Sequence, residues 1–114
     1  MMATLFKKII DKQIPAKIIF ENEKVLAFED IHPQAPHHIL IIPKTEIPTI
    51  NDLSAETAPL IGELFLAAKE IAAKLGVAEE GYRVVMNCNA GAGQTVFHLH
   101  LHFLAGRPLQ WPPG

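Results

Sequence analysis

The chain has 114 residues, of which 49% are hydrophobic, and its ten basic and twelve acidic side chains give a formal charge of −2. The near-neutral charge, without a long run of like charges, argues against broad nucleic-acid binding, and the longest strongly apolar run, at residues 39–42, is far too short to span a membrane. The single cysteine, Cys88, cannot form an internal disulfide and fits a reducing compartment. We therefore expect one soluble, unexported domain over residues 1–114, located in the cytoplasm.

The first predicted elements are a short helix and a hairpin. The helix begins after Thr4, which can cap it, ends before Pro15 and carries four apolar side chains on one face: Leu5, Phe6, Ile9 and Ile10. Residues 17–21 and 25–29 are rich in β-branched and aromatic side chains, and residues 21–24 between them have the composition of a turn. This pattern predicts two antiparallel strands.

The middle of the chain predicts a shaped loop, a third strand and one long helix. Two prolines in residues 31–36 restrict the backbone and remove donors, so this segment is a loop, and residues 37–42 form a strand that Pro43 stops. In residues 57–75 apolar side chains recur at intervals of three and four, which is typical of an amphipathic helix that ends at Gly76.

The last predicted elements are a strand at residues 82–87, a flexible connection at residues 89–94 and a final strand at residues 95–104. Together the elements predict an α+β fold with a mainly antiparallel sheet of about five strands, one long helix and one short helix. We expect the helices to cover one side of this sheet.

Three histidines alternate with apolar residues in the final strand. Because side chains of a strand point alternately to opposite faces, one face takes His98, His100 and His102, and the core face takes Phe97, Leu99, Leu101 and Phe103. In a helix the same spacing would leave no apolar side. A row of imidazoles can present neighbouring rings to one small substrate or to one metal ion.

Zinc and a phosphate are the two ligands that this row could bind. A His-x-His pair on a strand can supply two zinc ligands, and a third imidazole would complete an open site, although no acidic residue lies close in sequence to fix the tautomers. The residues before the strand favour a phosphate, because Gly91 and Gly93 let the backbone approach an anion, and Gln94 and Thr95 add side-chain donors. We favour the phosphate and keep zinc as the alternative.

A neutral imidazole beside a phosphate can attack phosphorus and form a covalent intermediate that water then cleaves. The central His100 is the predicted nucleophile. Its other ring nitrogen needs an acceptor, for which a backbone carbonyl would serve, and the flanking histidines would donate to phosphoryl oxygens or protonate the leaving group.

The motif His98-Leu99-His100-Leu101-His102-Phe103-Leu104 resembles the signature of the histidine triad (HIT) nucleotide-binding proteins. Over essentially the whole chain, further stretches resemble the Hint branch, the purine nucleoside phosphoramidases: IIFEN, AFEDIHPQAPHHILIIPK, YRVVMN, GAGQTVFHLHLHFLAGR and WPPG. The resemblance implies a hydrolase that needs no cofactor or metal. It would cleave the P–N bond of purine nucleoside 5′-phosphoramidates, with acyl-adenylates as further substrates, through a nucleotidyl-His100 intermediate.

The resemblance also implies roles for single residues. His98 and His102 would shape the phosphate site, and His38 matches the family's fourth active-site histidine, so His37 is a bystander. Contacts to the α-phosphate or the leaving group would come from Asn87, Gly93, Gln94 and Thr95, the last of which stands where many relatives have serine. The base and ribose would lie among Phe6, Ile9, Ile14, Phe28, Asp30, Ile31 and Leu40, with Asp30 on the ribose hydroxyls. Taken alone, the apolar members of this set could equally be core, and Asp30 a turn residue.

Members of the Hint branch are homodimers, so the resemblance implies a purine nucleotide substrate and a second copy of the chain as partners, with neither nucleic acid nor membrane. The long helix and the strand before the glycine loop would form the interface, and Trp111 would reach the partner's site, unless it packs on its own surface. Two other functions stay open: a nucleotide-binding regulatory module with incidental hydrolysis, and a dinucleoside polyphosphate hydrolase.

Overall fold

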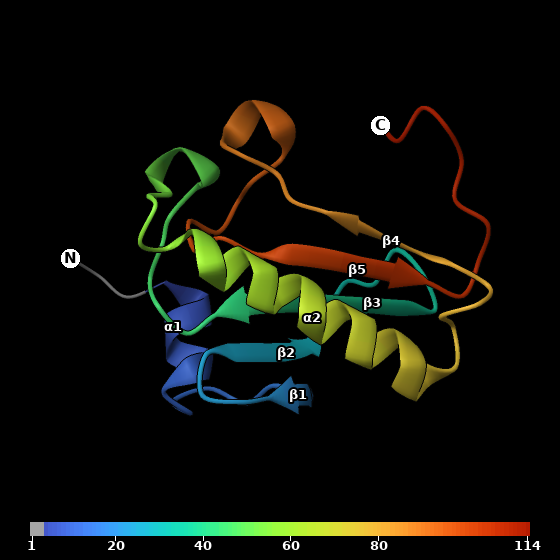
Figure 1. The fold of residues 1–114 in the computed structure, drawn as a ribbon, viewed down its shortest axis with the longest axis horizontal. Coiled ribbons are helices and arrows are strands. Elements are labelled where there is room, and N and C mark those ends of the chain that lie inside the picture. The colour runs from blue at the N-terminus through green and yellow to red at the C-terminus, as the bar shows by residue number, and fades with distance from the viewer. Residues whose placement is uncertain (1–3) are drawn as a thin grey trace.

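A five-stranded antiparallel sheet in the order β1-β2-β3-β5-β4 forms the centre of the protein (Figure 1). The computed structural model describes residues 4–114. The strands are β1 (Ile18–Glu21), β2 (Val25–Glu29), β3 (His37–Pro43), β4 (Tyr82–Val85) and β5 (Leu101–Ala105). The helices are α1 (Leu5–Ile10) and α2 (Ala58–Leu75), with short 3₁₀ helices η1 (Ile50–Asp52) and η2 (Ala90–Ala92). The predicted α+β class with one long and one short helix is therefore confirmed.

Both helices begin and end where the sequence supplies suitable residues. The Thr4 hydroxyl caps α1 by accepting a hydrogen bond from the Lys7 N–H at 3.1 Å. Helix α2 has Pro59 in its first turn and ends at Gly76, whose φ of 74° is a left-handed conformation that favours glycine. In residues 4–114 no helix combines the length and the apolar character needed to cross a membrane.

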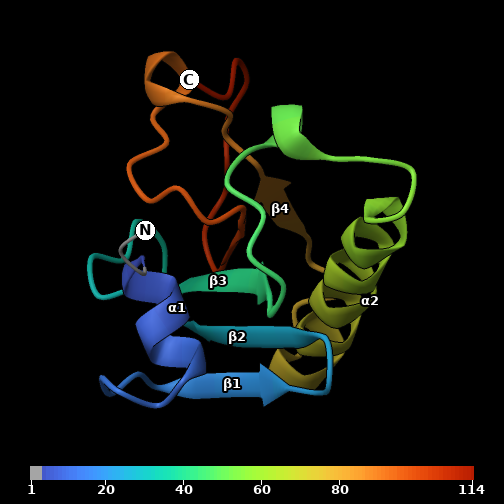
Figure 2. The ribbon, with the colours of Figure 1, turned by 90° about the vertical axis from the view of Figure 1, so that its left-hand side faces the viewer.

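The two helices cover opposite faces of the sheet, and the expectation that they share one face is wrong (Figure 2). On one face the strand residues Val25, Ala27, Ile39 and Ile41 pack with α2. On the other face Leu26, Phe28, Leu40 and Ile42 pack with Phe6 and Ile9 of α1. The physical reason lies in β2 and β3 themselves. They are almost continuously apolar rather than alternating, which is typical of strands with both faces buried.

The final strand is shorter than predicted. Only residues 101–105 pair with β3 and β4, whereas residues 95–100 lie before the ladder. The Leu99 N–H instead donates to the Ile47 carbonyl at 2.7 Å, in the connection between β3 and α2. Phe97, which we expected in the core, is 44% exposed. The alternation still holds for residues 98–103, because Leu99, Leu101 and Phe103 belong to the core beneath α2.

The connection at residues 89–94, predicted as flexible, is closed by its own hydrogen bonds. The Asn89 N–H donates to the Gln94 side-chain oxygen at 2.7 Å, and the Gln94 N–H donates back to the Asn89 carbonyl at 3.1 Å. Gly93 has a φ of 98°, so glycine is required to turn the chain here. The loop thus fixes the path by which the chain enters the histidine segment.

Candidate active site

A cavity of about 710 Å³ opens on the α1 face of the sheet. Its volume is in the range of pockets that hold small organic ligands. All seven residues predicted to bind the nucleoside line it: Phe6, Ile9, Ile14, Phe28, Asp30, Ile31 and Leu40. Thr95, His38, His100 and His102 also line it, so one cavity joins an apolar region to a cluster of imidazoles.

Other predicted site residues lie outside this cavity. Asn87 and Gly93 adjoin each other, since a Cβ at Gly93 would lie 3.9 Å from the Asn87 amide nitrogen. Trp111 is 82% exposed on the C-terminal tail and does not line the cavity of its own chain.

Gln94 was predicted to offer a side-chain donor to a phosphate, and in the structure both N–H groups of its amide are already bonded within the chain. Its side chain is buried, and the amide nitrogen donates to the carbonyls of Pro48 at 2.8 Å and Val96 at 3.1 Å. Its side-chain oxygen accepts from Asn89. Since both N–H groups of the Gln94 amide are bonded to carbonyls of the chain, Thr95 is the remaining side-chain donor of this pair.

His100 is held in the tautomer that a nucleophile needs. Its Nδ1–H donates to the His98 carbonyl at 2.7 Å, which is the kind of backbone acceptor expected from the sequence. Burial lowers the pKa of His100, opposed by this hydrogen bond and by Asp30, so the ring is neutral near pH 7. In a neutral ring with Nδ1 protonated, Nε2 carries a free lone pair. The edge of Phe6 packs against the ring, with centroids 5.0 Å apart.

His98 lies behind His100 and acts as a support. It is 1% exposed, and its Nε2–H donates to the Pro43 carbonyl at 2.7 Å, at the end of β3. Burial lowers its pKa, so this ring is neutral as well. Because the His98 carbonyl receives the His100 Nδ1–H, anchoring His98 to β3 also places the predicted nucleophile.

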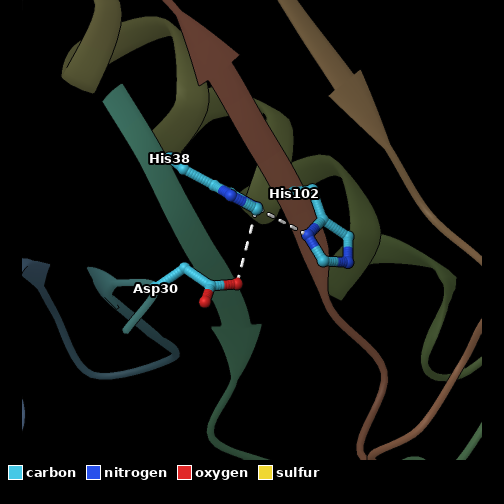
Figure 3. Close-up of side chains that lie close together, drawn as sticks. All are labelled: Asp30, His38 and His102. Atoms are coloured by element: carbon cyan, nitrogen blue, oxygen red, sulfur yellow. Dashed lines mark hydrogen bonds and ion pairs between the residues drawn. The ribbon is translucent and has the colours of Figure 1, made fainter. Parts of the chain in front are cut away.

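His38 and His102 share one hydrogen bond beside the Asp30 carboxylate (Figure 3). The Gln34 N–H donates to His38 Nδ1 at 3.0 Å, so the proton of this ring is on Nε2. His38 Nε2–H therefore donates to His102 Nδ1 at 2.9 Å, and Asp30 Oδ2 lies 3.5 Å from the same nitrogen. It follows that neutral His102 carries its own proton on Nε2.

Burial, followed by the neighbouring His100 and His38, lowers the pKa of His102 to about 4. Burial likewise lowers the pKa of His38, which Asp30 partly opposes. At pH 7 the cluster consists of neutral rings with alternating donors and acceptors. Such a network can donate a hydrogen bond to a phosphoryl oxygen through a ring N–H.

Asp30, His38 and His102 also bring three potential metal-binding atoms within 4.8 Å of one another. The fold thus supplies the carboxylate that the local sequence lacks. The tautomer of His38 opposes metal binding, however, because its Nε2 carries a proton while Nδ1 accepts the Gln34 N–H. A metal ion on Nε2 would have to displace this proton and break the backbone hydrogen bond.

The model of the HIT domain family matches residues 11–109 of this chain. The chain belongs to the HIT family. It is 52% identical over 106 residues to the Escherichia coli K12 protein named purine nucleoside phosphoramidase, covering 93% of this chain and 89% of that protein. A HIT-like protein of Synechocystis is also 52% identical, over 97% of this chain and 96% of its own length.

Solved HIT structures agree with the fold. The HIT family hydrolase of Legionella pneumophila Philadelphia 1 superposes with a TM-score of 0.96 at 50% identity, covering 98% of this chain and all of that one. The HIT family hydrolase of Clostridium thermocellum gives a TM-score of 0.93 at 43% identity, covering 96% of each chain.

The main-chain groups that fix the tautomers of His38 and His98 in this HIT protein were not predicted. The Gln34 N–H and the Pro43 carbonyl leave no trace in residue identity, because every residue has a backbone carbonyl and every residue except proline has an N–H. Two further cavity residues were not predicted, Lys17 and Glu29, which form an ion pair of 3.1 Å across the hairpin. Their opposite charges on neighbouring predicted strands were a usable signal.

Proposed function

We propose that this HIT protein is a purine nucleoside phosphoramidase that cleaves adenosine 5′-monophosphoramidate and related substrates to AMP and an amine. The observation that carries the proposal is His100, whose Nδ1–H is bound by a carbonyl at 2.7 Å and whose ring lines the cavity with Nε2 unprotonated. The phosphoramidase of E. coli, 52% identical over most of both chains, supports the same activity.

In the proposed reaction the His100 Nε2 lone pair attacks the α-phosphorus, and the P–N bond to the amine breaks. The leaving amine takes a proton from solvent, and Thr95, which lines the same cavity, donates a hydrogen bond to the departing nitrogen through its hydroxyl. Water then attacks phosphorus and gives up one proton to solvent, the Nε2–P bond breaks with its electron pair returning to Nε2, and the neutral ring is restored as AMP is released. Acyl-adenylates would react in the same way at their P–O bond.

His102 would act as a hydrogen-bond donor in this reaction rather than as a proton donor. With a pKa of about 4, its ring is neutral at pH 7, and a neutral imidazole holds its N–H proton strongly. The Nε2–H would stabilise negative charge on a phosphoryl oxygen in the transition state. Of the two roles expected for the flanking histidines, the tautomers favour this one.

The nucleoside would occupy the apolar part of the cavity. Phe6 and Phe28 form an edge-to-face pair with centroids 5.4 Å apart, against which a purine could pack. Asp30 accepts the His32 N–H through Oδ1 at 2.8 Å, and the lone pairs left on its two oxygens suit the ribose hydroxyls. Asp30 would thus be both the turn residue and the ribose ligand.

We also propose that the active form is a homodimer. Phe65 and Leu66 on α2 are 49% and 58% exposed, and Tyr82 on β4 is 39% exposed. Large apolar side chains at these positions suit an interface formed by the long helix and β4. The exposed Trp111 would then reach the partner's cavity. Light scattering of the purified protein should give twice the chain mass of 12.6 kDa.

The test is turnover of adenosine 5′-monophosphoramidate by chelator-treated protein, beside its His100→Gly variant and with diadenosine polyphosphates as competing substrates. The wild type should release AMP without metal, and the variant should be inactive. Loss of activity on chelation would contradict the metal-free mechanism. Faster cleavage of the polyphosphates would make this a dinucleoside polyphosphate hydrolase, and nucleotide binding without turnover would make it a binding module.

A further inference from the structure

The segment that follows β5 reaches back to the loop before His38. Arg107 donates its Nε–H to the Gln34 carbonyl at 3.0 Å, and its Nη1–H to the Pro108 carbonyl at 3.1 Å. The first of these contacts joins residues 73 positions apart in the sequence. A charged donor makes a stronger hydrogen bond than a neutral one, so the loop is tied to the end of β5.

Gly106 strengthens this connection through close packing. A Cβ at this position would lie 2.8 Å from the Pro36 Cβ, and the φ of 99° disfavours any other residue. The chain after β5 therefore approaches the loop at residues 31–36 as closely as glycine permits. Pro36 and Gln34 are both fixed from the same side.

The main chain of Gln34 links this contact to the imidazoles. Its carbonyl is held by Arg107, and its N–H donates to His38 Nδ1 at 3.0 Å. Residues 31–36 belong to no strand, so the sheet ladder does not hold this backbone in place. The Gln34 N–H decides which nitrogen of His38 is protonated, and thereby which nitrogen of His102 is protonated.

We infer that Arg107 is a positioning residue for the His38–His102 pair. It holds Gln34 so that both rings keep their Nε2–H tautomers, and this keeps the His102 Nε2–H available as a donor to the substrate. The catalytic consequence rests on the proposed phosphoramidase function, whereas the effect on the tautomers does not. Arg107 itself does not line the cavity.

Three variants test the inference. Arg107→Met keeps an unbranched apolar stem and removes every donor, and Arg107→Lys restores one charged donor group. Arg83→Met is the matched control, because Arg83 also donates to a carbonyl of the C-terminal segment, that of Gln110 at 3.0 Å, but has no hydrogen bond to residues 31–36 or to a histidine in the described part of the chain. Arg107 is exposed, so its replacement should leave the fold intact.

The first measurement is the tautomeric state of the histidines, from two-bond ¹H–¹⁵N correlation spectra of the free protein. The wild type should show His38 and His102 protonated on Nε2. In Arg107→Met the Nδ1 and Nε2 resonances of both rings should shift toward each other, as the tautomers mix. Arg107→Lys should restore most of the wild-type pattern, and Arg83→Met should leave it unchanged.

The second measurement is the turnover of adenosine 5′-monophosphoramidate. Arg107→Met should lower kcat on the order of tenfold with little change in KM, because the donor is misplaced only in the transition state. Unchanged tautomers in Arg107→Met, or equal shifts in Arg83→Met, would overturn the inference. If the wild type is inactive, the proposed function fails, and the spectra still decide the role of Arg107.

Discussion

The two faces of the sheet are built from alternate residues of the same strands, yet they differ in almost every physical respect. The face under α2 is a continuous apolar core that includes Leu64, Ile71, Leu101 and Phe103, each at most 1% exposed. The face under α1 holds a smaller apolar cluster, a cavity and four imidazoles whose hydrogen bonds are largely made to main-chain groups.

This difference shows how stability and chemistry are separated within one small domain. Burying neutral imidazoles is costly unless their nitrogens have partners, and backbone groups near the ends of β3 supply several of them. The burial of apolar side chains beneath α2 stabilises the whole sheet and offsets the free energy lost by burying the imidazoles. Changes on the two faces should therefore have separable effects on stability and on activity.

The largest loss of stability is expected from Phe103→Ala. Phe103 is fully buried beneath α2 and stacks with Tyr82, with centroids 5.0 Å apart. Removing this ring should lower the free energy of unfolding by about 4 kcal/mol, from lost burial and a new cavity. Urea denaturation at fixed protein concentration measures the loss. Folded Phe103→Leu should keep wild-type kcat, and a tenfold fall in its kcat would contradict the separation of the faces.

The next largest loss is expected from His98→Ala, on the opposite face. This change leaves the Pro43 carbonyl without its donor and opens a cavity behind His100, so the free energy of unfolding should fall by about 2–3 kcal/mol. Unlike Phe103→Leu, it should also lower kcat, because the carbonyl that holds His100 Nδ1–H loses its anchor. Denaturation and turnover, measured on the same preparation, check both parts. Full activity in a destabilised His98→Ala variant would show that His98 contributes to stability but does not position His100.

The α1 face should also make stability depend on pH. Burial lowers the pKa of His38, His98, His100 and His102 below the ordinary value of 6.5, so between pH 6.5 and about 4 the unfolded chain binds more protons. The contribution of these histidines to the free energy of unfolding is fully present above pH 6.5 and is lost as the pH is lowered toward 4. His102 should contribute on the order of 2 kcal/mol, less than its full shift because the ring is partly exposed.

Denaturant melts at a series of pH values measure this dependence. The matched comparison is His102→Gln, in which the fall between pH 6.5 and 4 should be shallower. If the free energy of unfolding of His102→Gln falls as steeply as that of the wild type, His102 is not the source of the pH dependence.

The smallest effect is expected at the rim of the cavity. Lys17 and Glu29 form an exposed ion pair of 3.1 Å, which is screened by solvent. Lys17→Gln should change the free energy of unfolding by less than about 0.5 kcal/mol. Thermal melts in low and high salt measure it. A change above 1 kcal/mol would mean that the Lys17–Glu29 ion pair contributes substantially to the stability of the α1 face.

Much of the fold could be predicted from the sequence because local patterns decide it. The cap at Thr4, the period of α2 and the stop at Gly76 act within a few residues. The nearly continuous apolar runs of β2 and β3 already indicated strands buried on both faces. The placement of α1 on the far face was missed because the sequence does not show which helix covers which face. The final strand was predicted too long because alternation alone does not show where a partner strand ends.

The site divides in the same way. The seven residues of the nucleoside pocket and His100 were predicted from the motif and the family resemblance, and all of them line one cavity in the structure. The occupied amide of Gln94 and the main-chain donor at Gln34 could not be predicted, since both depend on how a loop folds back on itself. Residue identity shows which groups are present but not which are already bonded.

The alternation along β3 also matters for directed evolution. Leu40 faces the cavity, while its neighbours Ile39 and Ile41 face the core under α2. A library that varies Phe6, Phe28 and Leu40 would therefore sample new substrate shapes while leaving the larger core unaltered. Neighbouring residues of β3 would therefore respond to different selection pressures. Residues under α2 would be selected for stability, and residues at the cavity for substrate specificity.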